Sequence, residues 1–244
     1  MFPAETLQAT TLAAAAPERR LVALGAPDSA AAEQYRVLHQ RLLRLAARRP
    51  MRLVAITSAD HGEGRTTTAA NLAFTAAQEG RAVLLVETDL RRPALAALLD
   101  LAPRAGLGEL LDGRAELAQA VARVGPLSVL CAGEVTDPIA ATRSARVPAL
   151  VEQLRAAYDL VVLDAPPAMS FAGGDRLASA ADAVVLVIRA GVTPRQVTRF
   201  ALDSLGDRAV GVVLNDVDAE TVAHGRWLFA GPVEAREAAS RRAG

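Results

Sequence analysis

Short apolar runs recur along the chain, and longer stretches with helical spacing separate most of them. The runs are rich in Val and Leu with few polar interruptions, which is typical of strands covered on both faces, as in a parallel sheet. Strands that alternate with helices predict an α/β fold, a doubly wound, mostly parallel sheet with helices on both faces. The predicted strands span residues 52–57, 82–88, 127–131, 159–164, 183–189 and 210–215.

The remaining pattern divides the chain into three parts. Residues 1–30 are rich in Ala, Thr and Pro without a sustained period, which predicts a mobile arm. From residue 31 to residue 49, apolar and basic positions alternate at helical spacing, and Pro50 follows. This predicts an amphipathic helix with a basic face. We therefore expect one domain over residues 31–216 and a C-terminal tail over residues 217–244.

Composition narrows the class of protein. Basic and acidic residues both number 27, so a nucleic-acid binder that relies on gross charge is not expected. No apolar run approaches the roughly 20 residues that span a bilayer. The N-terminus lacks the pattern of a signal peptide, and the single cysteine, Cys131, fits a reducing compartment. We expect a cytoplasmic protein. The chain contains no lysine, so every basic side chain is an arginine.

The stretch ADHGEGRT, residues 59–66, follows a predicted strand and precedes a predicted helix, as a phosphate-binding loop does. Gly62 and Gly64 allow a tight path whose N–H groups lie at the positive end of the helix. Arg65 stands at the usual lysine position, and Thr66 offers a hydroxyl to Mg²⁺. A plain strand–helix turn is the alternative. The candidate nucleotide-binding residues are Ala59, Asp60, His61, Gly62, Glu63, Gly64, Arg65, Thr66 and Thr67.

Acidic side chains lie at the carboxyl ends of two further predicted strands. Glu87 and Asp89 lie two residues apart in VETDLRRP, on one side of an extended chain, and Asp164 ends the strand in VVLDAPP. One acid could hold Mg²⁺ and another could accept a proton from an attacking hydroxyl. The alternatives are an acidic loop paired with Arg91 and Arg92, and a helix cap at Asp164. Ligands bind beyond the carboxyl ends of such strands. The glycine-containing loop, the Glu87–Asp89 segment and Asp164 together therefore predict a nucleotide–Mg²⁺ site.

The stretch ITSADHGEGRTTTAANLAFTAAQEGRAVLLVETDLRRP resembles the bacterial tyrosine kinases of capsule and exopolysaccharide systems, the CpsD/CapB type. The resemblance continues through YDLVVLDAPP and GVVLN and covers about residues 31–216. It implies a P-loop NTPase of the MinD/ParA branch that uses ATP and Mg²⁺. By this resemblance Arg65, Asp89 and Asp164 would be catalytic, and Thr66, Glu87 and Asp164 would lie at the metal.

The resemblance also implies assembly. Glu33, Arg36 and His39 match a Glu-x-x-Arg-x-x-Arg segment that packs subunits into a ring, with His39 replacing the last arginine. A homo-oligomer is expected, recruited to the inner face of the membrane by a membrane chain-length determinant (polysaccharide co-polymerase) protein. The residues after Asn215 lack the tyrosine cluster that the family's kinases phosphorylate.

Three functions remain open from the sequence. The first is a kinase that acts on tyrosines of other proteins, and the second is a weakly active or inactive nucleotide-binding regulator of polysaccharide export. The third and least favoured is a MinD/ParA-type positioning ATPase. Such ATPases carry a lysine where this chain has Asp60.

Overall fold

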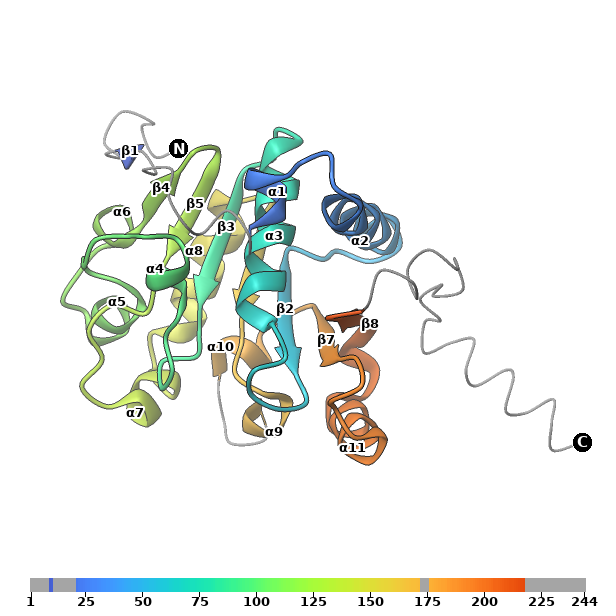
Figure 1. The fold of residues 1–244 in the computed structure, drawn as a ribbon. Coiled ribbons are helices and arrows are strands. Elements are labelled where there is room, and N and C mark those ends of the chain that lie inside the picture. The colour runs from blue at the N-terminus through green and yellow to red at the C-terminus, as the bar shows by residue number, and fades with distance from the viewer. Residues whose placement is uncertain (1–8, 11–20, 172–175, 218–244) are drawn as a thin grey trace, which may run out of the picture.

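A computed structural model describes residues 9–10, 21–171 and 176–217 and contains an eight-stranded sheet (Figure 1). All six predicted strands are present, which confirms the α/β prediction, and the two short strands β1 and β4 were not predicted. The strands are β1 (Ala9–Thr10), β2 (Leu53–Ser58), β3 (Val83–Glu87), β4 (Ala122–Val124), β5 (Leu127–Leu130), β6 (Leu160–Asp164), β7 (Ala183–Arg189) and β8 (Ala209–Asn215).

The strand order is β1-β4-β5-β3-β6-β2-β7-β8. Every neighbouring pair is parallel except β4 and β5, which form an antiparallel pair. Strand β2 lies between β6 and β7, and β3 lies on the other side of β6. The carboxyl ends of β2, β3 and β6 therefore meet at one edge of the sheet, which brings the three predicted site segments together.

Alternate residues of each central strand belong to two separate cores. On β2, Leu53 and Ala55 pack into one core, while Val54 and Ile56 pack into the other. Successive side chains of a strand point to opposite faces of the sheet, and here both faces are buried. Buried residues of α1, α2, α3 and α4 belong to the second core, and those of α5, α8, α10 and α11 to the first (Figure 1). The sheet is therefore covered on both faces, as predicted.

The helices of the described residues vary from one turn to almost five. They are α1 (Val22–Gly25), α2 (Ala30–Ala46), α3 (Arg65–Gln78), α4 (Leu95–Leu98), α5 (Leu107–Asp112), α6 (Leu117–Ala120), α7 (Pro138–Thr142), α8 (Val147–Ala157), α9 (Ala168–Phe171), α10 (Arg176–Ser179) and α11 (Arg195–Leu205). The amphipathic helix predicted from residue 31 is α2, and the Ser29 hydroxyl caps its first turn by accepting from the Ala32 N–H at 3.1 Å.

Residues 21–30, which we expected to belong to a mobile arm, instead pack on the domain. Leu21 and Ala23 are buried, and the Ala23 N–H donates to the Asn71 side chain on α3 at 3.0 Å. The Gln78 amide donates to the Ala23 carbonyl at 3.0 Å. The composition of this segment did not indicate that Leu21 and Ala23 would be buried against the domain. The rest of the arm except Ala9–Thr10, and the tail from residue 218, lie outside the described residues.

Candidate nucleotide-binding site

The predicted phosphate loop joins β2, which ends at Ser58, to α3, which begins at Arg65. Gly62 and Gly64 have φ angles of 77° and 92°, in the left-handed region that glycine adopts without strain. The 14-residue helix that follows has N–H groups in its first turn without intrahelical acceptors, at its positive end. This local geometry resembles that of an anion-binding loop, and phosphate binding by residues 59–67 stays a prediction.

The Glu63 side chain stabilises the conformation of the loop by hydrogen bonds to its backbone. Its carboxylate accepts from the N–H groups of Ala59 at 2.8 Å and Asp60 at 3.1 Å, and also accepts from the Thr193 hydroxyl. The Asn215 amide donates to the Glu63 carbonyl at 2.9 Å. Sequence reasoning missed Thr193 and Asn215. Thr193 follows β7 and Asn215 ends β8, so both lie at the carboxyl edge of the sheet, and this position was the available signal.

Thr66 and Asp164 meet at the carboxyl edge, as predicted. The Thr66 side chain is hydrogen-bonded to the Asp164 carboxylate. Asp164 is 2% exposed, and its Oδ1 atom has no hydrogen-bond partner in the part of the chain that the structure describes. A buried, unpaired carboxylate oxygen beside a threonine hydroxyl offers the oxygen ligands that Mg²⁺ prefers. The residues present therefore fit this metal.

The electrostatic environment of Asp164 leads to the same conclusion. Burial raises the pKa of its carboxyl to about 7. The Thr66 hydrogen bond and the Arg65 charge lower this pKa, whereas the charges of Glu87 and Asp89 raise it. A carboxylate that is buried among other acids gains most from a nearby cation.

Arg65 and Asp89, both predicted as catalytic, are paired with each other. The Arg65 guanidinium donates to Asp89 Oδ2 at 3.0 Å and to the Ser58 hydroxyl at 3.2 Å. The Arg92 N–H donates to Asp89 Oδ1 at 3.3 Å. The side chains of Arg65 and Asp89 are 10% and 6% exposed, so this is a mostly buried ion pair. The guanidinium thus reaches across to the loop after β3.

Glu87, predicted as a metal ligand, has a structural set of partners. Its carboxylate accepts from the backbone N–H groups of Ala94 at 2.5 Å, Leu95 at 2.7 Å and Ala132 at 3.0 Å. Glu87 is 1% exposed. Because both oxygens already serve buried donors, this geometry opposes the metal-ligand prediction. The additional methylene of glutamate lets the carboxylate reach the start of α4 and the chain after β5.

The predicted oligomerisation residues on α2 do not share one environment. Glu33 and Arg36 form a surface ion pair of 2.7 Å, and the Arg36 guanidinium also donates to the Pro27 carbonyl at 2.9 Å. His39 is 1% exposed, and its Nδ1 atom lies 3.2 Å from Glu79 Oε2. His39 therefore belongs to the interior of this chain, which opposes its prediction as an interface residue. Glu33 and Arg36 stay interface predictions.

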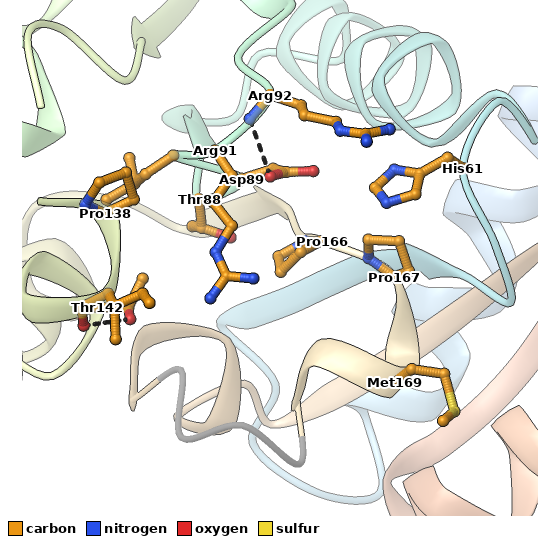
Figure 2. Close-up of a pocket in the computed structure, with 12 residues that line it drawn as sticks. His61, Thr88, Asp89, Arg91, Arg92, Pro138, Thr142, Pro166, Pro167 and Met169 are labelled. Atoms are coloured by element: carbon orange, nitrogen blue, oxygen red, sulfur yellow. Dashed lines mark hydrogen bonds between the residues drawn. The ribbon is translucent and has the colours of Figure 1, made fainter.

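A cavity of about 420 Å³ opens beside Asp89 (Figure 2). His61 of the phosphate loop, Arg91 and Arg92 after β3, and Thr142 of α7 contribute polar side chains to its wall. Pro167 and other apolar residues complete the wall. The cavity thus adjoins the loop, the Arg65–Asp89 pair and the segment after Asp164, which makes it the place where a second reactant could approach the site.

The fold and the site together define a P-loop nucleotide-binding protein. The family model of the CobQ/CobB/MinD/ParA nucleotide binding domain matches residues 54–226. The septum site-determining protein MinD of Pyrococcus horikoshii, solved in complex with Mg-ADP, aligns with a TM-score of 0.56 and 25% identity, over 71% of this chain and 76% of that chain.

More specific relatives narrow the class. The tyrosine-protein kinase YwqD of Bacillus subtilis is 35% identical over 81% of this chain and 86% of its own length. The kinase domain of the Escherichia coli tyrosine kinase ETK aligns with a TM-score of 0.73 and 25% identity over 82% of both chains. The chain belongs to the family of bacterial tyrosine-protein kinases that includes YwqD, CpsD and CapB.

A longer relative connects the family to polysaccharide transport. The succinoglycan biosynthesis transport protein ExoP of Rhizobium meliloti is 31% identical over 81% of this chain, and the match covers 26% of ExoP. The family that the sequence pattern suggested is therefore confirmed.

Proposed function

We propose that this chain transfers the γ-phosphoryl group of ATP to a tyrosine of another protein in a polysaccharide export system. Family membership supports the reaction class. The observation that carries the proposal is the Thr66–Asp164 pair, in which a buried carboxylate oxygen without a partner lies next to a hydroxyl. Such a pair, next to a glycine-containing loop at a helix N-terminus, suits a magnesium-bound triphosphate.

The residues divide into three roles. The backbone N–H groups from Gly62 to Thr66 would hold the phosphates, and Glu63 would keep this loop in shape. Thr66 and Asp164 would hold Mg²⁺, which when bound supplies positive charge to the phosphate oxygens. Glu87 is left out of the metal set because backbone donors occupy its carboxylate.

Asp89 would act as the base. In the transfer, the acceptor phenol oxygen forms a bond to the γ-phosphorus while the bond from that phosphorus to the β–γ bridging oxygen breaks. The phenol proton moves to the Asp89 carboxylate, and ADP leaves with the electron pair of the broken bond. Arg65 would balance negative charge next to Asp89, since its guanidinium lies 3.0 Å from that carboxylate.

One observation favours a second candidate, a nucleotide-dependent regulator with little transfer. Asp89 is engaged by the Arg65 guanidinium and by the Arg92 N–H, so neither carboxylate oxygen is free of a donor. In this alternative, nucleotide binding would change contacts with partners while the base stays paired. The two candidates use the same nucleotide site and differ in whether Asp89 accepts a proton.

The partner class follows from the relatives. ExoP is named a biosynthesis transport protein, which supports a partner in the export apparatus, such as a membrane chain-length determinant. Among the described residues, no helix has the length and apolar character needed to cross a bilayer. Recruitment by such a partner is part of the proposal, as is self-assembly through the exposed Glu33–Arg36 face of α2.

The test uses the full purified chain with labelled ATP, Mg²⁺ and a tyrosine-containing acceptor protein. We expect label on tyrosine, and we expect Asp164→Ala or Thr66→Ala to lower transfer about 100-fold or more. Asp112→Ala is the matched control, because Asp112 pairs with Arg114 on the surface. Nucleotide binding without transfer would favour the regulator, and failure to bind ATP or ADP would refute both candidates.

A further inference from the structure

The cavity next to Asp89 has two arginines whose charge the nucleotide site does not use. Arg91 and Arg92 line it and are exposed. Among the described residues, neither guanidinium donates a hydrogen bond or forms an ion pair, unlike that of Arg65. Unpaired guanidinium groups at the wall of a cavity are well suited to bind carboxylates, because they present several donors in one plane.

The two guanidinium groups point in different directions. In Figure 2 the Arg92 side chain extends toward His61, while the Arg91 guanidinium points toward the space between Thr142 and Pro166. Asp89 lies between them, and the Arg92 N–H donates to Asp89 Oδ1 at 3.3 Å. A segment bound with its reacting group at Asp89 would therefore meet a positive charge on each side.

The rest of the wall offers apolar surface at the mouth of the cavity. Ile139 of α7 is 48% exposed and Met169 of α9 is 51% exposed, and both line the cavity together with Pro166 and Pro167. A methionine sulfur and proline rings pack well against the face or edge of an aromatic ring. The cavity thus combines an apolar wall, an acid and two unpaired cations.

Neither of the two tyrosines in the sequence lines the cavity. No tyrosine follows Tyr158 in the sequence. The Tyr158 hydroxyl is hydrogen-bonded to Ser128, and the Tyr35 hydroxyl is hydrogen-bonded to Asn71. Ser128 lies on β5 and Asn71 lies on α3, so both hydroxyls are engaged away from the cavity.

From these features we infer that the cavity binds an acidic acceptor segment, in which carboxylate side chains flank the tyrosine on both sides. Its ring would pack on Met169 and Pro167, and its flanking carboxylates would pair with Arg91 and Arg92. This inference rests on the proposed kinase function and adds the sequence class of the acceptor. The phenol proton goes to Asp89 and the phosphoryl group goes from ATP to the phenol oxygen, as described above.

The test compares two peptides with cores Glu-Glu-Tyr-Glu-Glu and Gln-Gln-Tyr-Gln-Gln, using the full chain, ATP and Mg²⁺. We expect kcat/KM to be about tenfold higher for the acidic peptide, mainly through a lower KM. This is the size of effect expected from two solvent-exposed ion pairs between the peptide and the protein. The double variant Arg91→Gln/Arg92→Gln should reduce this ratio to about one. The control Arg48→Gln/Arg49→Gln makes the same charge change on exposed residues before the amino end of β2, at the opposite sheet edge, and should keep the ratio.

The outcomes separate the two proposals. Equal kcat/KM for both peptides would overturn the acidic-acceptor inference and leave the kinase function intact. A preference lost equally in both double variants would also overturn it, since net charge alone would explain it. If neither peptide is phosphorylated and the acceptor protein of the first test also gains no label, the kinase function fails. Binding of the two peptides, measured by fluorescence anisotropy with ADP and Mg²⁺, then tests the inference. The inference requires that the acidic peptide binds more tightly and that this difference is lost in the Arg91→Gln/Arg92→Gln variant.

Discussion

Glu87 ends strand β3 and Asp89 follows two residues later, and the structure gives them opposite surroundings. The Glu87 carboxylate accepts from three backbone N–H groups, belonging to Ala94, Leu95 and Ala132. The Asp89 carboxylate pairs with an arginine of the phosphate loop and adjoins the cavity. Glu87 thus joins segments of the fold, whereas Asp89 lies where two reactants could meet.

The difference shows what decides the role of an acid at a strand end. Both residues are nearly buried, with exposed fractions of 1% and 5%, so burial does not distinguish them. The partners do. The Glu87 carboxylate accepts from neutral backbone donors that need a permanent acceptor, whereas the Asp89 carboxylate pairs with a charged arginine side chain and lines the cavity. We expect substitutions at Glu87 to affect stability first, and those at Asp89 to affect chemistry first.

The largest expected effect is on folding, at Glu87. Glu87→Ala should lower the free energy of unfolding by about 4 kcal/mol, because three N–H donors, two of them at the start of α4, lose a charged acceptor. Urea denaturation followed by circular dichroism measures this loss. Glu152→Ala on the exposed face of α8 is the control, with a change within about 0.5 kcal/mol.

A contrary result would reverse the comparison. If Glu87→Ala kept its stability and instead lost Mg²⁺-dependent nucleotide binding, Glu87 would belong to the metal site after all. The N–H donors would then have found water, and the structural role assigned to this side chain would be wrong.

The next effect is on the reaction, at Asp89. Asp89→Asn keeps the shape of the side chain and one acceptor for Arg65 but removes the base, so transfer should fall about 100-fold, equivalent to ~2.7 kcal/mol in the barrier. Its unfolding free energy should change by less than about 1.5 kcal/mol. Initial rates of phosphotyrosine formation at saturating ATP provide the measurement. A variant that transfers at the wild-type rate would remove Asp89 from the chemistry and favour the regulator.

A third prediction uses Asp164, whose pKa is raised mainly by burial and further by the charges of Glu87 and Asp89. Its folded pKa of about 7 lies above the ordinary value of 3.8, so its contribution to stability is complete at low pH and is lost as the pH rises through 7. In EDTA, wild type should lose about 2 kcal/mol of unfolding free energy between pH 5 and pH 7 relative to Asp164→Asn. Mg²⁺ with ADP should reduce this loss. Parallel pH profiles for the two proteins would contradict the assignment.

The core of the fold could be predicted because its signals are local. Runs such as 159–164 and 183–189 are apolar at successive positions, and a strand buried on both faces requires this pattern. β4 could not be predicted, since it has three residues and only one apolar face. It is a strand because it pairs with β5. The packing of Leu21 and Ala23 depends on α3, which no local pattern reveals.

The site divides in the same way. The glycine-rich loop, Thr66 and Asp164 could be predicted because each has a fixed place after its own strand. The roles of Glu87 and His39 could not, since each depends on what the fold brings to it: the start of α4 in one case and Glu79 in the other. Thr193 and Asn215 could not be found for the same reason, because they contact Glu63 from 130 and 152 residues away.

The smallest expected effect concerns the partner that distinguishes Asp89 from Glu87. Arg65→Lys replaces a planar guanidinium, which donates to both Ser58 and Asp89, with a single ammonium group. Unfolding free energy should fall by about 1 kcal/mol, and transfer should rise because Asp89 is less tightly held. Urea denaturation and initial rates measure both, with Arg114→Lys as the control in an exposed pair. Unchanged stability together with slower transfer would mean that the Arg65 guanidinium serves the phosphates, so that its pairing with Asp89 does not restrain the base.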